Sequence, residues 1–195
     1  SACSLPPFSI SDNIKEEIKK CVSKIANEIN VVGLMNTQLA LKDNFLYVLE
    51  VNPRASRTVP FVAKSIGVPI AKIAAKIMTG KLLKDFLPFL KEEEPKTFNV
   101  KESVFPFNKF EGADLILGPE MKSTGEVMGI DKSFLTAFIK SQIASGTILP
   151  VKGNVFLSVD DKNKKRLLPI ASKLELLGFK LIATKGTSSY LRENG

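Results

Sequence analysis

Histidine and tryptophan are absent from this chain of 195 residues, and aromatic side chains make up only 8% of it. Without histidine the chain has no Ser-His-Asp or Cys-His nucleophile, no histidine general base and no zinc site with imidazole ligands. Any metal must therefore be held by oxygen ligands, which suit Mg²⁺ or Mn²⁺.

Cysteines and long apolar runs are also scarce. Cys3 and Cys21 form no metal-site spacing, and we interpret them as reduced thiols of a cytoplasmic protein, with a disulfide as the alternative. No apolar run reaches the ~20 residues that cross a bilayer, and the first residues lack the basic and apolar regions of a signal peptide. We expect no membrane partner. Because there is no initiator Met, we expect the chain to begin within a longer protein.

Positive charge exceeds negative charge, with 28 Lys and Arg against 20 Asp and Glu. Such a balance permits binding to nucleic acid, acidic lipid or phosphorylated metabolites and does not choose among them. The basic residues are scattered, as on solvated helix faces. No stripe of Lys and Arg alternates with aromatic residues, so we expect no nucleic-acid partner and keep a basic nucleic-acid-binding domain only as an alternative.

The first half of the chain mixes helical and extended patterns. Apolar spacing predicts helices over 12–29, with Asp12 as the cap, over 58–66, and from Pro69 to Gly80. Two apolar runs, 32–41 and 45–51, flank turn residues and predict an antiparallel hairpin. Residues 81–99 are less regular, 100–110 read as an extended segment, and 112–129 as a glycine-containing stretch.

The second half ends in a different pattern. A helix over 134–143 is followed by a strand over 155–159, a helix over 162–177, a strand over 179–183 and a helix start. This alternation is typical of a parallel α/β unit. We therefore predict an α/β protein in which a part with an antiparallel sheet precedes a partial parallel domain. The predicted divisions are 1–80, 81–146 and 147–195.

The predicted hairpin contains the strongest candidates for a metal site. If it turns about Asn44, Gln38 lies opposite Glu50 and Asn36 lies opposite Asn52, with directly opposed Cβ atoms about 4.5–5.5 Å apart. The amide and carboxylate oxygens then converge as a divalent-cation site that needs nucleotide phosphate to complete its charge.

Two arginines, Arg54 and Arg57, follow the second strand of the hairpin. Guanidinium groups suit phosphoryl oxygens, and a metal with arginine is typical of phosphoryl transfer. The chain has no P-loop motif. The alternative is that Glu50 and Asn52 simply face solvent and that Asn-Pro begins a turn.

One longer run closely resembles the end of an ATP-grasp domain, and more narrowly the carbamate-phosphorylating half of the carbamoyl-phosphate synthase large subunit. It covers residues 49–61 (LEVNPRASRTVPF). Further segments resemble the same family in the same order: 1–6 (SACSLP), 33–36 (GLMN), 107–110 (FNKF), 117–121 (LGPEM) and 123–129 (STGEVMG). The resemblance covers essentially the whole chain, and its last part, from about residue 147, resembles the start of a methylglyoxal-synthase-like regulatory domain.

The resemblance implies an ATP-dependent ligase that phosphorylates carbamate to carbamoyl phosphate for arginine and pyrimidine biosynthesis. It implies ATP, Mg²⁺ or Mn²⁺, and K⁺ as cofactors, a glutaminase small subunit as partner, and an oligomer. Gln38, Glu50 and Asn52 match the family's metal ligands, of which Gln38 and Glu50 also adjoin the nucleotide. Arg57 and Arg54 match arginines that contact the transferred phosphate.

The resemblance also implies regulation. Glu102 matches part of an ornithine-type activator site, with an exposed strand glutamate as the alternative. A nucleotide monophosphate effector is expected at Ser158, Lys164, Thr184 and Thr187, because helix N-termini with hydroxyl groups favour phosphate. The alternative is that Thr184 and Thr187 only cap a helix.

This stretch lacks the other parts of that large chain, so we expect no turnover by the 195 residues alone. Another ATP-grasp ligase, such as a carboxylase or purine-pathway enzyme, is the alternative within the same fold.

Overall fold

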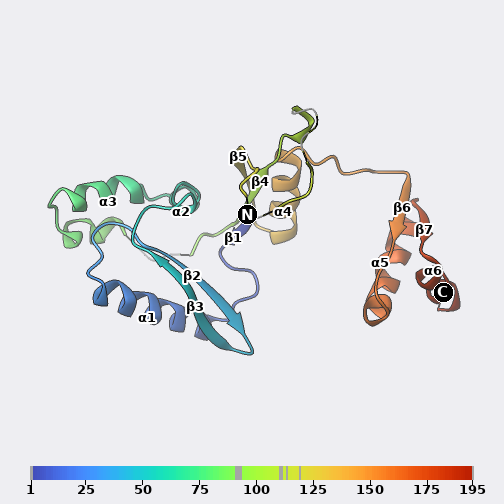
Figure 1. Cartoon of the computed structure of the whole chain (residues 1–195), viewed down its shortest axis with the longest axis horizontal. Helices are drawn as coiled ribbons and strands as arrows, with labels where there is room; N and C mark the ends of the chain where they lie inside the picture. The colour runs from blue at the N-terminus through green and yellow to red at the C-terminus, as the bar shows by residue number, and fades with distance from the viewer. Residues whose placement is uncertain (1, 91–93, 110–111, 113, 119, 195) are drawn as a thin grey trace. The chain divides into compact units, whose positions relative to one another are not determined.

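The chain forms two compact units, Ser1–Thr147 and Ile148–Gly195 (Figure 1). The computed structural model describes residues 2–90, 94–109, 112, 114–118 and 120–194. Antiparallel strands occur in the first unit and a parallel pair in the second, which confirms the predicted fold class. The assignment of three named domains remains a prediction.

Two antiparallel sheets and a set of short helices build the first unit. Its strands are β1 (Cys3–Leu5), β2 (Asn36–Lys42), β3 (Phe45–Asn52), β4 (Phe98–Val104) and β5 (Gly125–Asp131). Its helices are α1 (Asp12–Glu28), α2 (Thr58–Ile66), α3 (Ile70–Met78), α4 (Phe134–Ala144) and the 3-10 helices η1 (Leu83–Phe89) and η2 (Phe107–Lys109). Strands β2 and β3 pair as a hairpin, and the other three form a sheet in the order β1-β4-β5.

The hairpin turns more tightly than predicted. Lys42 pairs with Phe45, so Asp43 and Asn44 alone form the turn. Both have positive φ, 52° and 64°, as a two-residue type I′ turn requires. The predicted strand over 32–41 begins only at Asn36, so that part of the prediction is wrong.

A β-bulge restores the register that the tighter turn would have lost. The pairing shifts by one residue between Gln38 and Leu39, where Leu39 faces Val48 and Gln38 faces Glu50. Leu49 is the extra residue. Without it, Gln38 would face Leu49, and Glu50 would lie on the other side of the hairpin.

Two strands of the other sheet were not predicted. β1 has three residues, and β5 lies in the stretch interpreted only as glycine-containing. Of the two glycines of β5, Gly129 has a packing role: a Cβ on it would lie 2.1 Å from the carbonyl oxygen of Ala137 on α4. Glycine here permits close approach of helix and strand rather than a loop.

The helices of the first unit agree with the predicted segments, with differences at their ends. α1 begins at Asp12 and has Ser11 as its N-cap, so the prediction that Asp12 is the cap is wrong. Pro69 is the N-cap of α3 rather than its first residue. Gly67, with φ 70°, ends α2 as predicted.

The second unit is a strand–helix–strand–helix chain. Its elements are β6 (Asn154–Leu157), η3 (Asp161–Asn163), α5 (Lys164–Leu176), β7 (Lys180–Ala183) and α6 (Lys185–Glu193). β6 and β7 pair in parallel, as predicted. Leu157, Leu167 and Ala171 form its buried core.

Cys3 and Cys21 are both free thiols, as the favoured interpretation holds. Among the helices formed by the described residues, none combines the length and the apolar content needed to cross a membrane.

Candidate functional site

The polar residues of the hairpin meet on one face, as predicted. Gln38 pairs with Glu50, and Asn36 pairs with Asn52. The amide Nδ2 of Asn52 donates a hydrogen bond of 2.8 Å to Oε1 of Glu50. Among the described residues no hydrogen bond engages Oδ1 of Asn52 or Oε2 of Glu50, so a ligand could bind both oxygens.

These residues fit a hard divalent cation. Their free atoms are carboxylate and amide oxygens, which Mg²⁺ and Mn²⁺ prefer. Within the described part of the chain no cluster of three or more His, Cys, Asp or Glu side chains could hold a metal. Glu50 is the one carboxylate that the described residues of the hairpin place on this face, so a cation here would also need water or an anionic ligand to complete its coordination.

The two arginines follow the hairpin but point elsewhere. Nη1 of Arg54 donates to the carbonyl oxygen of Ala55 at 2.9 Å. Arg57 is the N-cap of α2, and its guanidinium contacts the sulfur of Met121. Neither arginine is hydrogen-bonded to Gln38, Glu50 or Asn52 among the described residues, so the structure brings the oxygen donors together without joining the arginines to them.

Arg57 instead borders a separate cavity of about 430 Å³. Glu126 of β5 lines the same cavity. Its Oε1 forms an ion pair with Nζ of Lys101 on β4, at a distance of 2.7 Å. The Lys101 side chain is only 4% exposed. No local sequence pattern indicates this pair, because Lys101 and Glu126 lie 25 residues apart and meet only through the antiparallel pairing of β4 and β5.

Glu102 is half-buried rather than an exposed strand residue. Its Oε2 accepts a hydrogen bond of 2.8 Å from Nε2 of Gln142 on α4, and its Oε1 accepts one from the backbone N–H of Ser103. Both side chains line a cavity of about 500 Å³ that also includes Thr147. No local pattern could have revealed Gln142, which lies 40 residues away.

The predicted effector residues of the second unit gather where its two strands end. Thr184 is the N-cap of α6, and its hydroxyl donates to that of the buried Thr187 at 3.1 Å. Lys164 is adjacent, since a Cβ on Gly186 would lie 3.4 Å from its Nζ. Ser158 directly follows β6.

Lys164 already has partners in this cluster. Its Nζ forms an ion pair of 2.7 Å with Asp161 and lies 5.9 Å from the ring centre of Tyr190. The pKa of Asp161 is lowered, first by its hydrogen bond with Lys164 and second by the charge of that lysine. The ammonium group is thereby held near the N-terminus of α6, where an anion would bind.

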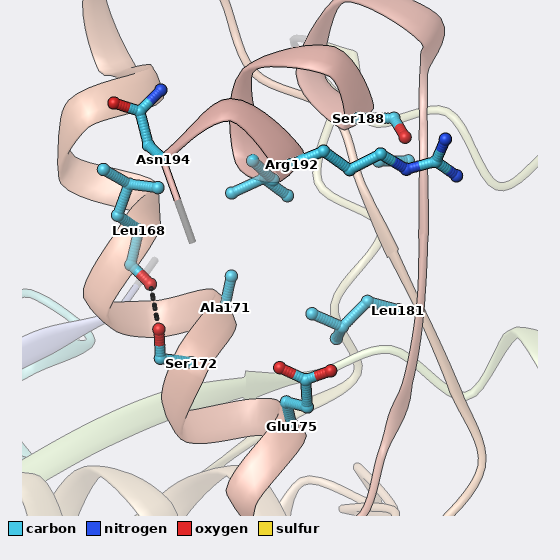
Figure 2. Close-up of a pocket in the computed structure, with 10 residues that line it drawn as sticks. Leu168, Ala171, Ser172, Glu175, Leu181, Ser188, Arg192 and Asn194 are labelled. Carbon is cyan, nitrogen blue, oxygen red and sulfur yellow. Dashed lines mark hydrogen bonds between the residues drawn. The ribbon is translucent and has the colours of Figure 1, made fainter.

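A further cavity of about 280 Å³ lies in the same unit, beside α5, β7 and α6. Figure 2 shows its apolar floor, with Ala171 and Leu181, and the charged groups of Glu175 and Arg192. Ser172 does not offer its hydroxyl proton to this cavity, because Oγ donates to the carbonyl oxygen of Leu168 at 3.1 Å. None of the predicted site residues lines it.

Comparison with protein families identifies both ends of the chain. Residues 3–86 match the family described as the carbamoyl-phosphate synthase L chain, ATP binding domain. Residues 166–195 match the MGS-like domain. The first match includes the hairpin and α2, and the second includes Thr184 and Thr187.

Similar proteins share the whole chain. It is 54% identical to the carbamoyl phosphate synthase large chain of Mesorhizobium japonicum and 53% identical to that of Pasteurella multocida, spanning 17% and 18% of their lengths. It is 51% identical to the C-terminal section of the large chain of Aquifex aeolicus, of which it spans 39%. In each case all of this chain is covered.

Proposed function

The chain belongs to the carbamoyl-phosphate synthase large-chain family, and we propose that it contributes to the ATP-dependent phosphorylation of carbamate to carbamoyl phosphate. The observation that carries this proposal is the cross-strand pairing of Gln38 with Glu50, together with the Asn52–Glu50 hydrogen bond. The chain spans less than a fifth of most of the relatives it matches, so the activity belongs to the longer protein.

Gln38, Glu50 and Asn52 would hold Mg²⁺ or Mn²⁺ at the phosphates of ATP. When bound, the cation would neutralise part of the negative charge of the phosphates. The chain's own contribution is geometric. The bulge at Leu49 holds Glu50 opposite Gln38, and the hydrogen bond from Asn52 fixes the orientation of the carboxylate.

We propose that Arg57, and with it Arg54, contacts the phosphate that is transferred. In this proposal both guanidinium groups leave the partners they have here, which are a thioether sulfur and a neighbouring carbonyl group. Those contacts are weaker than the charge-assisted hydrogen bonds that a phosphoryl group offers. Arg57 is the stronger candidate because it is the N-cap of α2 and borders a cavity.

The remaining roles of the longer protein follow from the same family. We propose an ornithine-type activator at Glu102, a nucleotide monophosphate at the cluster of Lys164, Thr184 and Thr187 with Ser158, and a glutaminase small subunit as partner. K⁺ as a further cofactor, an oligomeric assembly, and a place in arginine and pyrimidine biosynthesis are part of this proposal.

Replacing Glu50 by Gln in the full-length enzyme tests the catalytic proposal. The variant keeps the shape of the side chain and removes the single carboxylate of the hairpin face. We expect the rate of ATP formation from carbamoyl phosphate and ADP to fall about 100-fold or more, the size typical for loss of one group that stabilises transition-state charge.

The matched control is Asp43→Asn, which removes a carboxylate from the turn of the same hairpin. Asn adopts the positive φ of this position readily, so the control should keep its rate. A Glu50→Gln variant with a rate near that of the wild type would overturn the assignment.

A further inference from the structure

The carboxylate of Glu102 lies between its own strand and the end of a helix. Its Oε1 accepts a hydrogen bond of 3.0 Å from the backbone N–H of Ser103, the next residue of β4, and its Oε2 accepts one of 2.8 Å from Nε2 of Gln142 on α4. In the described part of the chain these are the hydrogen bonds of this carboxylate. Because each carboxylate oxygen can accept two hydrogen bonds, each keeps an acceptor position for a ligand.

The cavity beside Glu102 favours a positive charge. Of the described residues that line it, Glu102 is the one with a charged side chain, and the others are Ser103, Phe105, Gln142, Ser145, Gly146 and Thr147. The last four of these lie in the final turn of α4 or directly after it, where the helix dipole has its negative end. The carboxylate and the helix C-terminus therefore both attract a cation to this cavity.

Gln142 is held in place by the end of the helix. Gly146 has a φ of 97°, and the carbonyl oxygen of Gln142 accepts a hydrogen bond of 3.0 Å from the backbone N–H of Thr147. This is the Schellman arrangement, typical of a glycine that follows a helix. The side chain has a partner as well, because its Oε1 accepts a longer hydrogen bond, of 3.4 Å, from the hydroxyl of Thr147. With Oε1 bound there, Nε2 is the end of the amide that faces Glu102.

The bond from Gln142 ties the carboxylate to a second element. The bond from Ser103 is made within β4, so it does not fix the carboxylate relative to α4. The bond from Gln142 spans 40 residues of sequence and joins the strand to the helix at the cavity that both side chains line. An ammonium group in the cavity would then meet a carboxylate whose rotation is already restricted, which lowers the entropic cost of binding.

We propose that Gln142 is a positioning residue of the activator site, which holds the carboxylate of Glu102 in the orientation that binds an ammonium group of an ornithine-type ligand. The inference rests on the proposed function, because it takes the activator at Glu102 as its ligand. Gln142 acts through Glu102, and the negative end of α4 adds to the attraction of the cavity for a cation.

The experiment measures ATP formation from carbamoyl phosphate and ADP by the full-length enzyme at increasing concentrations of L-ornithine. Gln142→Met keeps the length of the side chain but cannot donate a hydrogen bond to Glu102. We expect the ornithine concentration for half-maximal activation to rise about tenfold, as for loss of one hydrogen bond to a charged group. The rate at saturating ornithine should match that of the wild type, because lost positioning weakens binding of the activator and not the chemical step.

Gln142→Lys separates positioning from simple packing. Its ammonium group would lie within reach of Glu102 and occupy the carboxylate as the ligand does, so ornithine should have no effect on the rate even at concentrations that saturate Gln142→Met. A residue that only packed α4 against β4 would not show this dependence on charge. Equal activation of the two variants, or an unchanged half-maximal concentration in Gln142→Met, would overturn the inference.

Ile143→Ala is the matched control. Ile143 follows Gln142 on α4, is 57% exposed and does not line the cavity, so its truncation should leave the half-maximal concentration of ornithine unchanged. A shift as large as that of Gln142→Met would show a general disturbance of the helix and would also contradict the inference.

Glu102→Gln tests the activator site itself, so the two proposals fail separately. If this variant keeps its activation by ornithine, or if ornithine does not activate the wild type, the proposed activator site is wrong and the inference fails with it. If Glu102→Gln removes the activation while both Gln142 variants keep that of the wild type, the activator site stands and Gln142 does not position its carboxylate.

Discussion

Single residues set the geometry of this molecule at two places. Leu49, as the extra residue of a bulge, turns Glu50 toward Gln38. Gly129 lets α4 lie directly on β5, where a Cβ would come within 2.1 Å of the Ala137 carbonyl oxygen and 2.5 Å of the Ser141 amide nitrogen. Neither contact partner is the mobile end of a side chain, so neither can move aside without shifting the helix.

Gly129→Ala should therefore destabilise the protein. The expected loss is about 1–3 kcal/mol, the usual effect of overpacking, measured as a lower urea midpoint. Gly125→Ala is the matched control on the same strand, since a Cβ there meets nothing within 4 Å. Equal stability of the two variants would show that α4 does not pack on β5 as closely as the structure has it.

At the scale of elements, β5 and α4 are joined by a charged contact as well as by close packing. Asp131, the last residue of β5, accepts hydrogen bonds from Nζ of Lys140 at 2.7 Å and from the backbone N–H of Ser133 at 3.0 Å. The bond with Lys140 is the main cause that lowers the pKa of Asp131, followed by the bond from Ser133.

The lowered pKa predicts a pH dependence with a definite sign. Folding favours the charged carboxylate, so the stabilising contribution is present above the ordinary pKa of 3.8 and disappears as the pH falls through the lower folded value. Asp131→Asn should be less stable than the wild type at pH 7, and the two should converge in strong acid. Urea midpoints measured from pH 7 to strong acid check this, and a constant difference would contradict it.

The elements also show where local patterns suffice. Apolar spacing predicts α1, α2, α4 and the strands β6 and β7, because each has one regular stripe or alternation of apolar residues that is at least partly shielded from solvent. It misses β1, which is too short to show a period, and β5, where glycine serves close packing. The hairpin was predicted with a longer turn, and only the compensating bulge made the expected facing of Gln38 and Glu50 correct.

At the scale of the whole molecule, the proposed catalytic and effector residues lie in different units. Gln38 and Glu50 belong to Ser1–Thr147, whereas Lys164, Thr184 and Thr187 belong to Ile148–Gly195. The hydroxyl pair and the ammonium group at the start of α6 form a cluster suited to phosphate. In this proposal the effector and the metal would bind to different compact units.

This arrangement predicts that the second unit binds a nucleotide monophosphate. Calorimetric titration of the full-length enzyme with uridine and inosine monophosphates should show binding of at least one of them. Lys164→Met should weaken that binding about tenfold or more, because it removes a charged partner of the phosphate. It should leave ATP formation from carbamoyl phosphate and ADP unchanged without effector. Absence of heat from both nucleotides would refute the effector site.

The amino-acid sequence alone determined the kind of chemistry open to this protein. Lack of histidine leaves oxygen ligands for a metal, and the motif around Glu50 and Asn52 indicates a nucleotide–cation site. Tertiary structure decided which residues actually meet: Gln38 and Glu50 through the Leu49 bulge, Lys101 and Glu126, and Glu102 and Gln142. Residue types and their spacing within one strand or helix can be taken directly from the sequence. Contacts between distant segments form only when strands pair and helices pack, so the sequence does not show them.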